Sequence, residues 1–77
     1  MNDPDTDRRQ AIALFRYGVI AELLHLPAGG KGLYTHLAER AAREYTIPGR
    51  TRTRVAAETI RDWLQAFRRG GFEALLP

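Results

Sequence analysis

Residues 55–71, VAAETIRDWLQAFRRGG, constrain the fold more than any other stretch of the chain. Their apolar side chains recur at steps of three and four, the period of one helix face, whereas a strand needs steps of two. Those side chains are Val55, Ile60, Trp63, Leu64 and Phe67. Gly70 and Gly71 adopt positive φ at no steric cost and predict the end of the helix. The spacing therefore predicts an amphipathic helix with one side on a core.

Two earlier segments show the same helical period. The first helix is expected over about residues 7–25, with this apolar face: Ile12, Phe15, Val19, Ile20, Leu23, Leu24 and Leu26. The second is expected over about residues 31–45, with an inner stripe of Tyr34, Leu37, Ala38, Ala41 and Tyr45. Its solvent side is expected to hold Glu39, Arg40, Arg43 and Glu44, paired as Glu39–Arg43 and Arg40–Glu44.

Chain length limits these helices to one small domain. The 77 residues bury only about 60% of their unfolded surface, which supports two packed layers of helices. Phe72, Leu75 and Leu76 predict a short helical turn that folds back onto the core. The expectation is an all-α bundle of three helices over residues 7–77, after a disordered tail over residues 1–6. The abrupt end at Pro77 suggests a fragment of a larger protein.

The connection between the first two helices is rich in glycine. Residues 26–32, LPAGGKG, predict a linker. A phosphate-binding loop would need a glycine five residues before its Gly-Lys pair and a Ser or Thr after the lysine. Those positions hold His25 and Gly32, so the linker is favoured.

The connection before the last helix is rich in arginine. Residues 46–54, TIPGRTRTR, begin with a turn signal at Pro48-Gly49 and fit a loop, a strand or a wing. In an extended segment Arg50, Arg52 and Arg54 would all face one side, because side chains alternate with a period of two. Arginines spaced in this way suit the successive phosphates of a duplex, and a disordered basic loop is the alternative.

Positive charge is concentrated before and along the last helix. The net charge is +3, yet residues 1–49 carry six basic and six acidic side chains, which cancel. Residues 50–69 carry six arginines against two acids. Such a basic face is typical of nucleic-acid binding, and a solvated basic helix is the alternative.

Several classes of function are disfavoured by composition. The absence of cysteine excludes disulfides, thiol catalysis and cysteine-ligated zinc. No apolar run approaches the roughly 20 residues of a membrane span, and no signal peptide is present, so a cytoplasmic location is expected. His25 and His36 lack metal-ligand spacing, and the acids form no acid–base couple. We therefore expect no enzyme activity, cofactor, metal, small-molecule substrate or membrane partner.

Residues 58–64, ETIRDWL, and 67–77, FRRGGFEALLP, resemble the end of the helix-turn-helix domain of insertion-sequence and Mu-type transposases. That family shows Thr, a branched apolar residue, two polar residues, Trp-Leu, an aromatic-basic stretch, Gly-Gly, a hydrophobic residue and Leu-x-Pro. The match covers about residues 33–77. Ala56 stands where the family has a capping serine, and the link before the last helix exceeds the usual three- or four-residue turn.

The resemblance implies a three-helix, homeodomain-like helix-turn-helix domain that binds double-stranded DNA at the terminal repeats of a mobile element. It further implies a bacterial, nucleoid-associated parent transposase that oligomerises on DNA and carries an RNase H-like catalytic domain downstream. The alternative is a small helical protein-interaction module, such as a transposition regulator or a subunit-docking domain.

On this reading the last helix enters the major groove. Its candidate base-reading residues are Ala57, Glu58, Thr59, Arg61, Asp62 and Gln65. Arg61 is suited to guanine, Gln65 to adenine and the carboxylates to cytosine. The candidate phosphate-binding residues are Lys31, Arg50, Arg52, Arg54, Arg68 and Arg69. Trp63 is expected in the core rather than stacked on a base.

Overall fold

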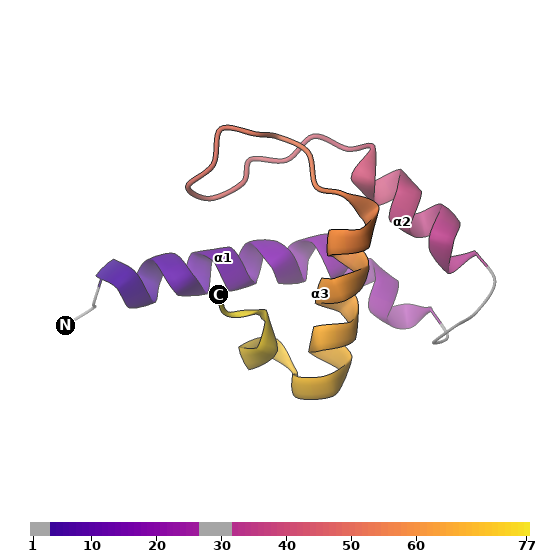
Figure 1. Ribbon diagram of the computed structural model, residues 1–77. Coiled ribbons are helices and arrows are strands. Elements are labelled where there is room, and N and C mark those ends of the chain that lie inside the picture. The colour runs from indigo at the N-terminus through magenta and orange to yellow at the C-terminus, as the bar shows by residue number, and fades with distance from the viewer. Residues whose placement is uncertain (1–3, 27–31) are drawn as a thin grey trace.

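The computed structural model describes residues 4–26 and 32–77, and all regular structure within them is helical (Figure 1). Helix α1 (Pro4–Ile20) continues into a 3-10 helix, η1 (Ala21–His25). Helix α2 (Leu33–Ala41) and helix α3 (Ala57–Gly70) follow, and a second 3-10 turn, η2 (Phe72–Leu75), lies near the C-terminus. The predicted all-α fold, with three helices and a C-terminal turn, is confirmed.

Helix α3 is the element on which the others converge. It contacts α1, α2 and η2, and it crosses in front of α1 in Figure 1. The buried apolar core draws on every element: Ala13, Val19, Ile20, Leu23, Leu37, Val55, Ile60, Leu64 and Leu75. A fully buried Ile or Leu side chain contributes about 1.5–3 kcal/mol, so Ile60 and Leu64 fix the inner side of α3 firmly.

Helix α1 begins earlier than the sequence pattern predicted. Residues 4–6, expected in a disordered tail, belong to this helix, and residues 1–3 lie outside the described part of the chain. Pro4 suits a first helical position because the N–H that it lacks would have no partner there. Asp5 and Asp7 lie in the first turn, where acidic groups favour the positive end of the helix.

Helix α2 is shorter than predicted and presents a different side to the core. It ends at Ala41, whereas residues up to Tyr45 were expected in it. Tyr34 is 77% exposed and Ala38 is exposed too, so the predicted inner stripe is wrong at both residues, while Arg40 is buried. The helix stops because Tyr45 makes other contacts: its backbone N–H donates to the Thr53 carbonyl at 2.7 Å, and its ring packs edge-on against α1.

The link between α2 and α3 is a long loop rather than a tight turn. Residues 42–56 fold back on themselves, and the Tyr45–Thr53 hydrogen bond joins the two arms (Figure 1). At the tip, the Arg50 N–H donates to the Ile47 carbonyl at 3.1 Å, and Gly49 has a φ of +73°. No strand occurs in residues 46–54, so this segment is a loop closed by hydrogen bonds.

The glycine pair ends α3 as predicted. Gly71 caps the helix with a φ of +69°, and its N–H donates to the Phe67 carbonyl at 2.8 Å. A Cβ on Gly70 would lie 3.1 Å from the Ala74 Cβ, so glycine permits the close return of η2. This return buries Leu75 against the core.

Candidate nucleic-acid interface

The outward side of α3 carries a compact set of polar side chains. Exposed residues recur there at steps of three and four, which places them on one helix face. They are Glu58, Arg61, Asp62 and Gln65, all predicted base-reading residues. The other two predicted residues, Ala57 and Thr59, are half-buried in the first turn of the helix. The structure therefore groups four of the predicted residues and places two at the border of the face.

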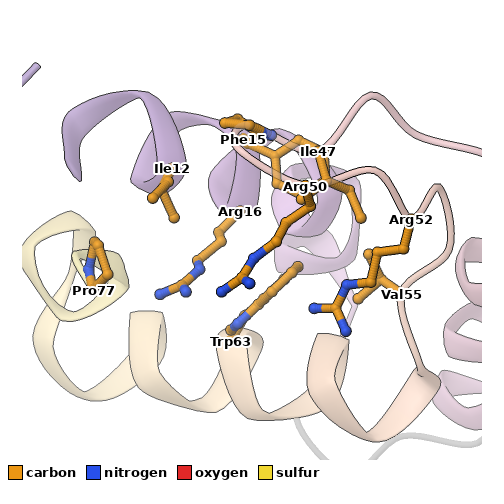
Figure 2. Close-up of a pocket in the computed structure, with 10 residues that line it drawn as sticks. Ile12, Phe15, Arg16, Ile47, Arg50, Arg52, Val55, Trp63 and Pro77 are labelled. Carbon is orange, nitrogen blue, oxygen red and sulfur yellow. The ribbon is translucent and has the colours of Figure 1, made fainter. Parts of the chain in front are cut away.

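The three arginines of the α2–α3 loop do not share one side, which corrects the expectation from the sequence. Arg50 and Arg52 are exposed and point toward α3 (Figure 2). Arg54 donates through Nη1 to the carbonyl of Ala42, and its Nη2 lies 3.9 Å from Glu44 Oε1. The loop turns and bends instead of extending, and the carbonyl-bearing end of α2 attracts the third guanidinium.

A cleft between α1, the loop and α3 gathers positive charge. Its volume is about 140 Å³, and Arg16, Arg50 and Arg52 line it together with Trp63. Figure 2 shows the three guanidiniums on the same side of the cleft, around the indole. We call this set the arginine cleft.

Arg16 is a member of the cleft that sequence reasoning missed. Its guanidinium carbon lies 5.4 Å from the centroid of the Trp63 ring, and its Nη1 donates to the Leu75 carbonyl at 2.9 Å. Burial lowers the pKa of Arg16, because desolvation disfavours the charged guanidinium. Arginine still carries its charge at neutral pH. The available signal was its position midway between Ile12 and Ile20, where a charge interrupts the apolar stripe.

Trp63 is half-buried rather than fully enclosed. Its ring lies 6.2 Å from that of Phe15 in an edge-on arrangement, and it also forms part of the wall of the arginine cleft. The tryptophan thus packs against the core on one side, as predicted, and borders the cleft on another.

The C-terminal end of α3 places its two arginines differently. Arg68 Nη2 donates to the Leu26 carbonyl at 3.1 Å, which ties α3 to the end of η1. Arg69 is exposed and has no side-chain partner in residues 4–26 or 32–77. Lys31, the remaining predicted phosphate-binding residue, lies outside the described residues.

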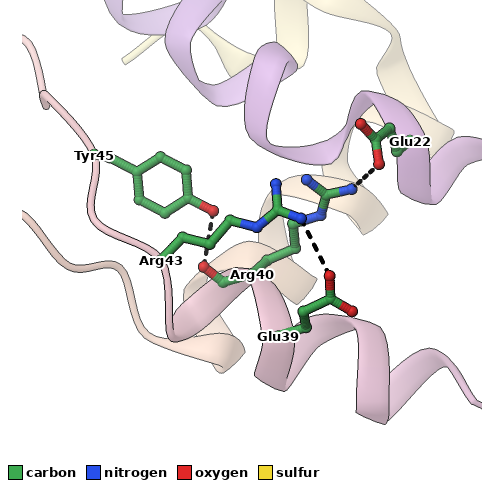
Figure 3. Close-up of polar contacts among 5 residues, drawn as sticks. All are labelled: Glu22, Glu39, Arg40, Arg43 and Tyr45. Carbon is green, nitrogen blue, oxygen red and sulfur yellow. Dashed lines mark hydrogen bonds and ion pairs between the residues drawn. The ribbon is translucent and has the colours of Figure 1, made fainter.

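Arg40 has a structural role that the sequence pattern did not predict. It was expected to face solvent and pair with Glu44, but its side chain is only 10% exposed and pairs with Glu22 of η1 (Figure 3). The Tyr45 hydroxyl donates to the Arg40 carbonyl at 2.8 Å. Of the two predicted pairs along α2, only that between Glu39 and Arg43 forms, at 3.1 Å.

The remaining chemistry of the surface is sparse. His25 and His36 are both exposed. The described part of the chain holds no group of three His, Asp or Glu side chains placed to bind a metal ion. Within those same residues, no helix combines the length and the apolar character of a membrane span.

No protein-family model, curated protein or solved structure matches this chain. The likeness to transposase helix-turn-helix domains therefore stays a prediction from the sequence.

Proposed function

We propose that the protein binds double-stranded DNA, with the outward face of α3 in the major groove and arginines on the flanking phosphates. The observation that supports this most is the division of α3 into two sides. Ile60 and Leu64 anchor the inner side, while Arg61 and Gln65 are exposed on the outer side. A rigidly held helix with a free polar face is what base reading in a groove requires.

Positive charge lies beside that face and at its C-terminal end. The arginine cleft borders the Trp63 side of α3, and Arg69 is exposed on the last turn of the helix. Phosphates border the major groove, so cations at these two places would hold the helix in register. Affinity from such contacts depends on salt, because each neutralised phosphate releases counterions.

The face itself contains two carboxylates, Glu58 and Asp62. Acids close to a duplex are repelled by phosphates, so they favour sequences where they can accept a hydrogen bond from the cytosine amino group. Arg61 is suited to the two acceptors of guanine, and Gln65 to adenine. This mixture favours sequence-specific binding over a purely electrostatic association.

The sequence resemblance adds the biological target. On that basis we propose that the DNA is the terminal repeat of a mobile element and that the parent protein is a transposase that oligomerises there. The domain itself would then position DNA and perform no chemistry.

A protein-interaction module is the second candidate. Leu14 and Tyr34 are 61% and 77% exposed on α1 and α2, which leaves apolar surface away from the arginine cleft. Contact with another protein would cover these side chains, and a contiguous apolar patch is what marks such a contact.

Measuring the affinity for duplex DNA at several salt concentrations separates the two candidates. DNA binding predicts a negative logarithmic slope of about 0.9 for each phosphate contact, and saturation at a defined stoichiometry. Selection from a random duplex pool should then enrich one sequence. Weak, unsaturable binding with no enriched sequence would reject the DNA proposal and favour the interaction module.

A further inference from the structure

Three guanidiniums meet in the arginine cleft although they come from distant parts of the chain. Arg16 belongs to the middle of α1, and Arg50 and Arg52 belong to the loop before α3 (Figure 2). Phe15 and Trp63 supply apolar wall on either side. A shallower hollow continues from the cleft toward Arg8.

The described side chains that line the cleft include no acid to balance this charge, and the terminal carboxyl group of Pro77, which also lines it, accepts a hydrogen bond from Arg9 Nη2 at 3.0 Å. Arg50 and Arg52 make no side-chain hydrogen bond or ion pair within residues 4–26 and 32–77, and Arg16 donates only to one backbone carbonyl. Like charges that converge beside apolar walls repel one another, and the walls weaken the screening by water. A bound anion turns this repulsion into attraction.

The size and donor set of the cleft select among anions. Its volume of about 140 Å³ admits a small oxyanion. One guanidinium fork satisfies the two oxygens of a carboxylate. Three forks, one from α1 and two from the loop, suit the several oxygens of a tetrahedral phosphate.

We infer that the arginine cleft is a binding site for a single phosphate group, held by Arg16, Arg50 and Arg52 against Trp63. Arg16 is fixed in advance by the Leu75 carbonyl and the indole ring, whereas the two loop arginines are free to close on the ligand. That the phosphate belongs to a DNA backbone rests on the proposed function. In that case the cleft seats one phosphodiester beside α3 and sets the register of the helix in the groove.

Trp63 is the one tryptophan of the chain and borders the cleft, so its fluorescence and its indole N–H resonance report directly on occupancy. Inorganic phosphate is titrated into the protein at neutral pH, with sodium chloride at matched ionic strength as reference. Phosphate should change both signals in a saturable way and chloride should not. The combined substitution of Arg50→Gln and Arg52→Gln should weaken phosphate binding at least tenfold, with an unchanged far-ultraviolet circular dichroism spectrum.

Arg69→Gln is the matched control, because it removes one exposed arginine from α3 outside the cleft. It should leave the phosphate titration unchanged. Equal responses to phosphate and chloride, or equal weakening by Arg69→Gln and by the double variant, would overturn the site.

Repeating the phosphate titration in the presence of duplex DNA identifies the source of the phosphate and separates this inference from the proposed function. Saturating duplex should abolish the response of Trp63 to added phosphate. A duplex that binds with steep salt dependence to a protein insensitive to phosphate would remove the site and keep DNA binding. Phosphate binding that persists unchanged in saturating duplex would keep the site and overturn the DNA backbone as its source.

Discussion

Two groups of arginines lie in the α2–α3 loop and at the end of α2, and they differ in what surrounds them. Arg40 and Arg54, near the end of α2, contact the carboxylates of Glu22 and Glu44. Arg50 and Arg52, at the other side of the loop, face Arg16 across a cleft whose described walls contain no acidic side chain. The first group is neutralised by the protein itself, whereas the second is left for a ligand.

The difference shows that arginine has two roles within residues 40–54, one in packing and one in exposed positive charge. An arginine with an internal partner and a buried stem contributes to packing. An exposed arginine without such a partner adds little to stability and is available to an anion. The role of each arginine therefore depends on whether the protein supplies a partner for its guanidinium, and not on how many arginines the segment contains.

Among the arginines, the largest effect on stability is expected at Arg40. Replacing it with Ala removes a buried stem and its contact with Glu22, and should lower the free energy of unfolding by about 1–3 kcal/mol. Urea unfolding followed by circular dichroism measures this change. DNA affinity per folded molecule should be unaffected, and a specific loss of affinity without loss of stability would assign Arg40 to the interface.

Arg61→Ala tests the outward face of α3. It should cost about 1–3 kcal/mol on the preferred duplex, and much less on random DNA, because only the correct base pair offers guanine acceptors. Anisotropy titrations on both duplexes measure the difference. Equal losses on the two would assign Arg61 to a phosphate instead of a base.

Two variants test the comparison within the loop. One combines Arg50→Ala with Arg52→Ala, and the other is Arg54→Ala alone. The combined variant should reduce the magnitude of the salt slope by about 0.9, because both arginines hold the same phosphate, with stability changed by less than about 0.5 kcal/mol. Arg54→Ala should leave the slope unchanged. A reduction by Arg54→Ala of half that size or more would make the loop one continuous phosphate-binding arm.

Local patterns predicted much of the fold. The three- and four-residue spacing located α3, and the paired glycines located its end, because backbone preference and amphipathic period depend on nearby residues alone. The outward residues of α3 followed from the same period. The start of α1 and the end of α2 were misplaced, since Pro4 fits a first turn and Tyr45 makes contacts distant in sequence.

The arginine cleft lay beyond such reasoning. Arg16 interrupts an apolar stripe, but its neighbours Arg50 and Trp63 lie more than thirty residues away in the sequence. Arg40 likewise resembled a solvent-facing residue of α2 until Glu22 of a different helix was placed beside it. The helical period of a sequence does not predict which charged side chains from different helices come into contact.

The amino-acid sequence alone determined that this chain forms three amphipathic helices and a returning turn, since side-chain period and glycine conformation act over a few residues. Only the tertiary structure decided which arginines are neutralised and which converge on a cleft. Charge pairing depends on the angles at which helices cross and on the path of a fifteen-residue loop, and those follow from packing of the whole core.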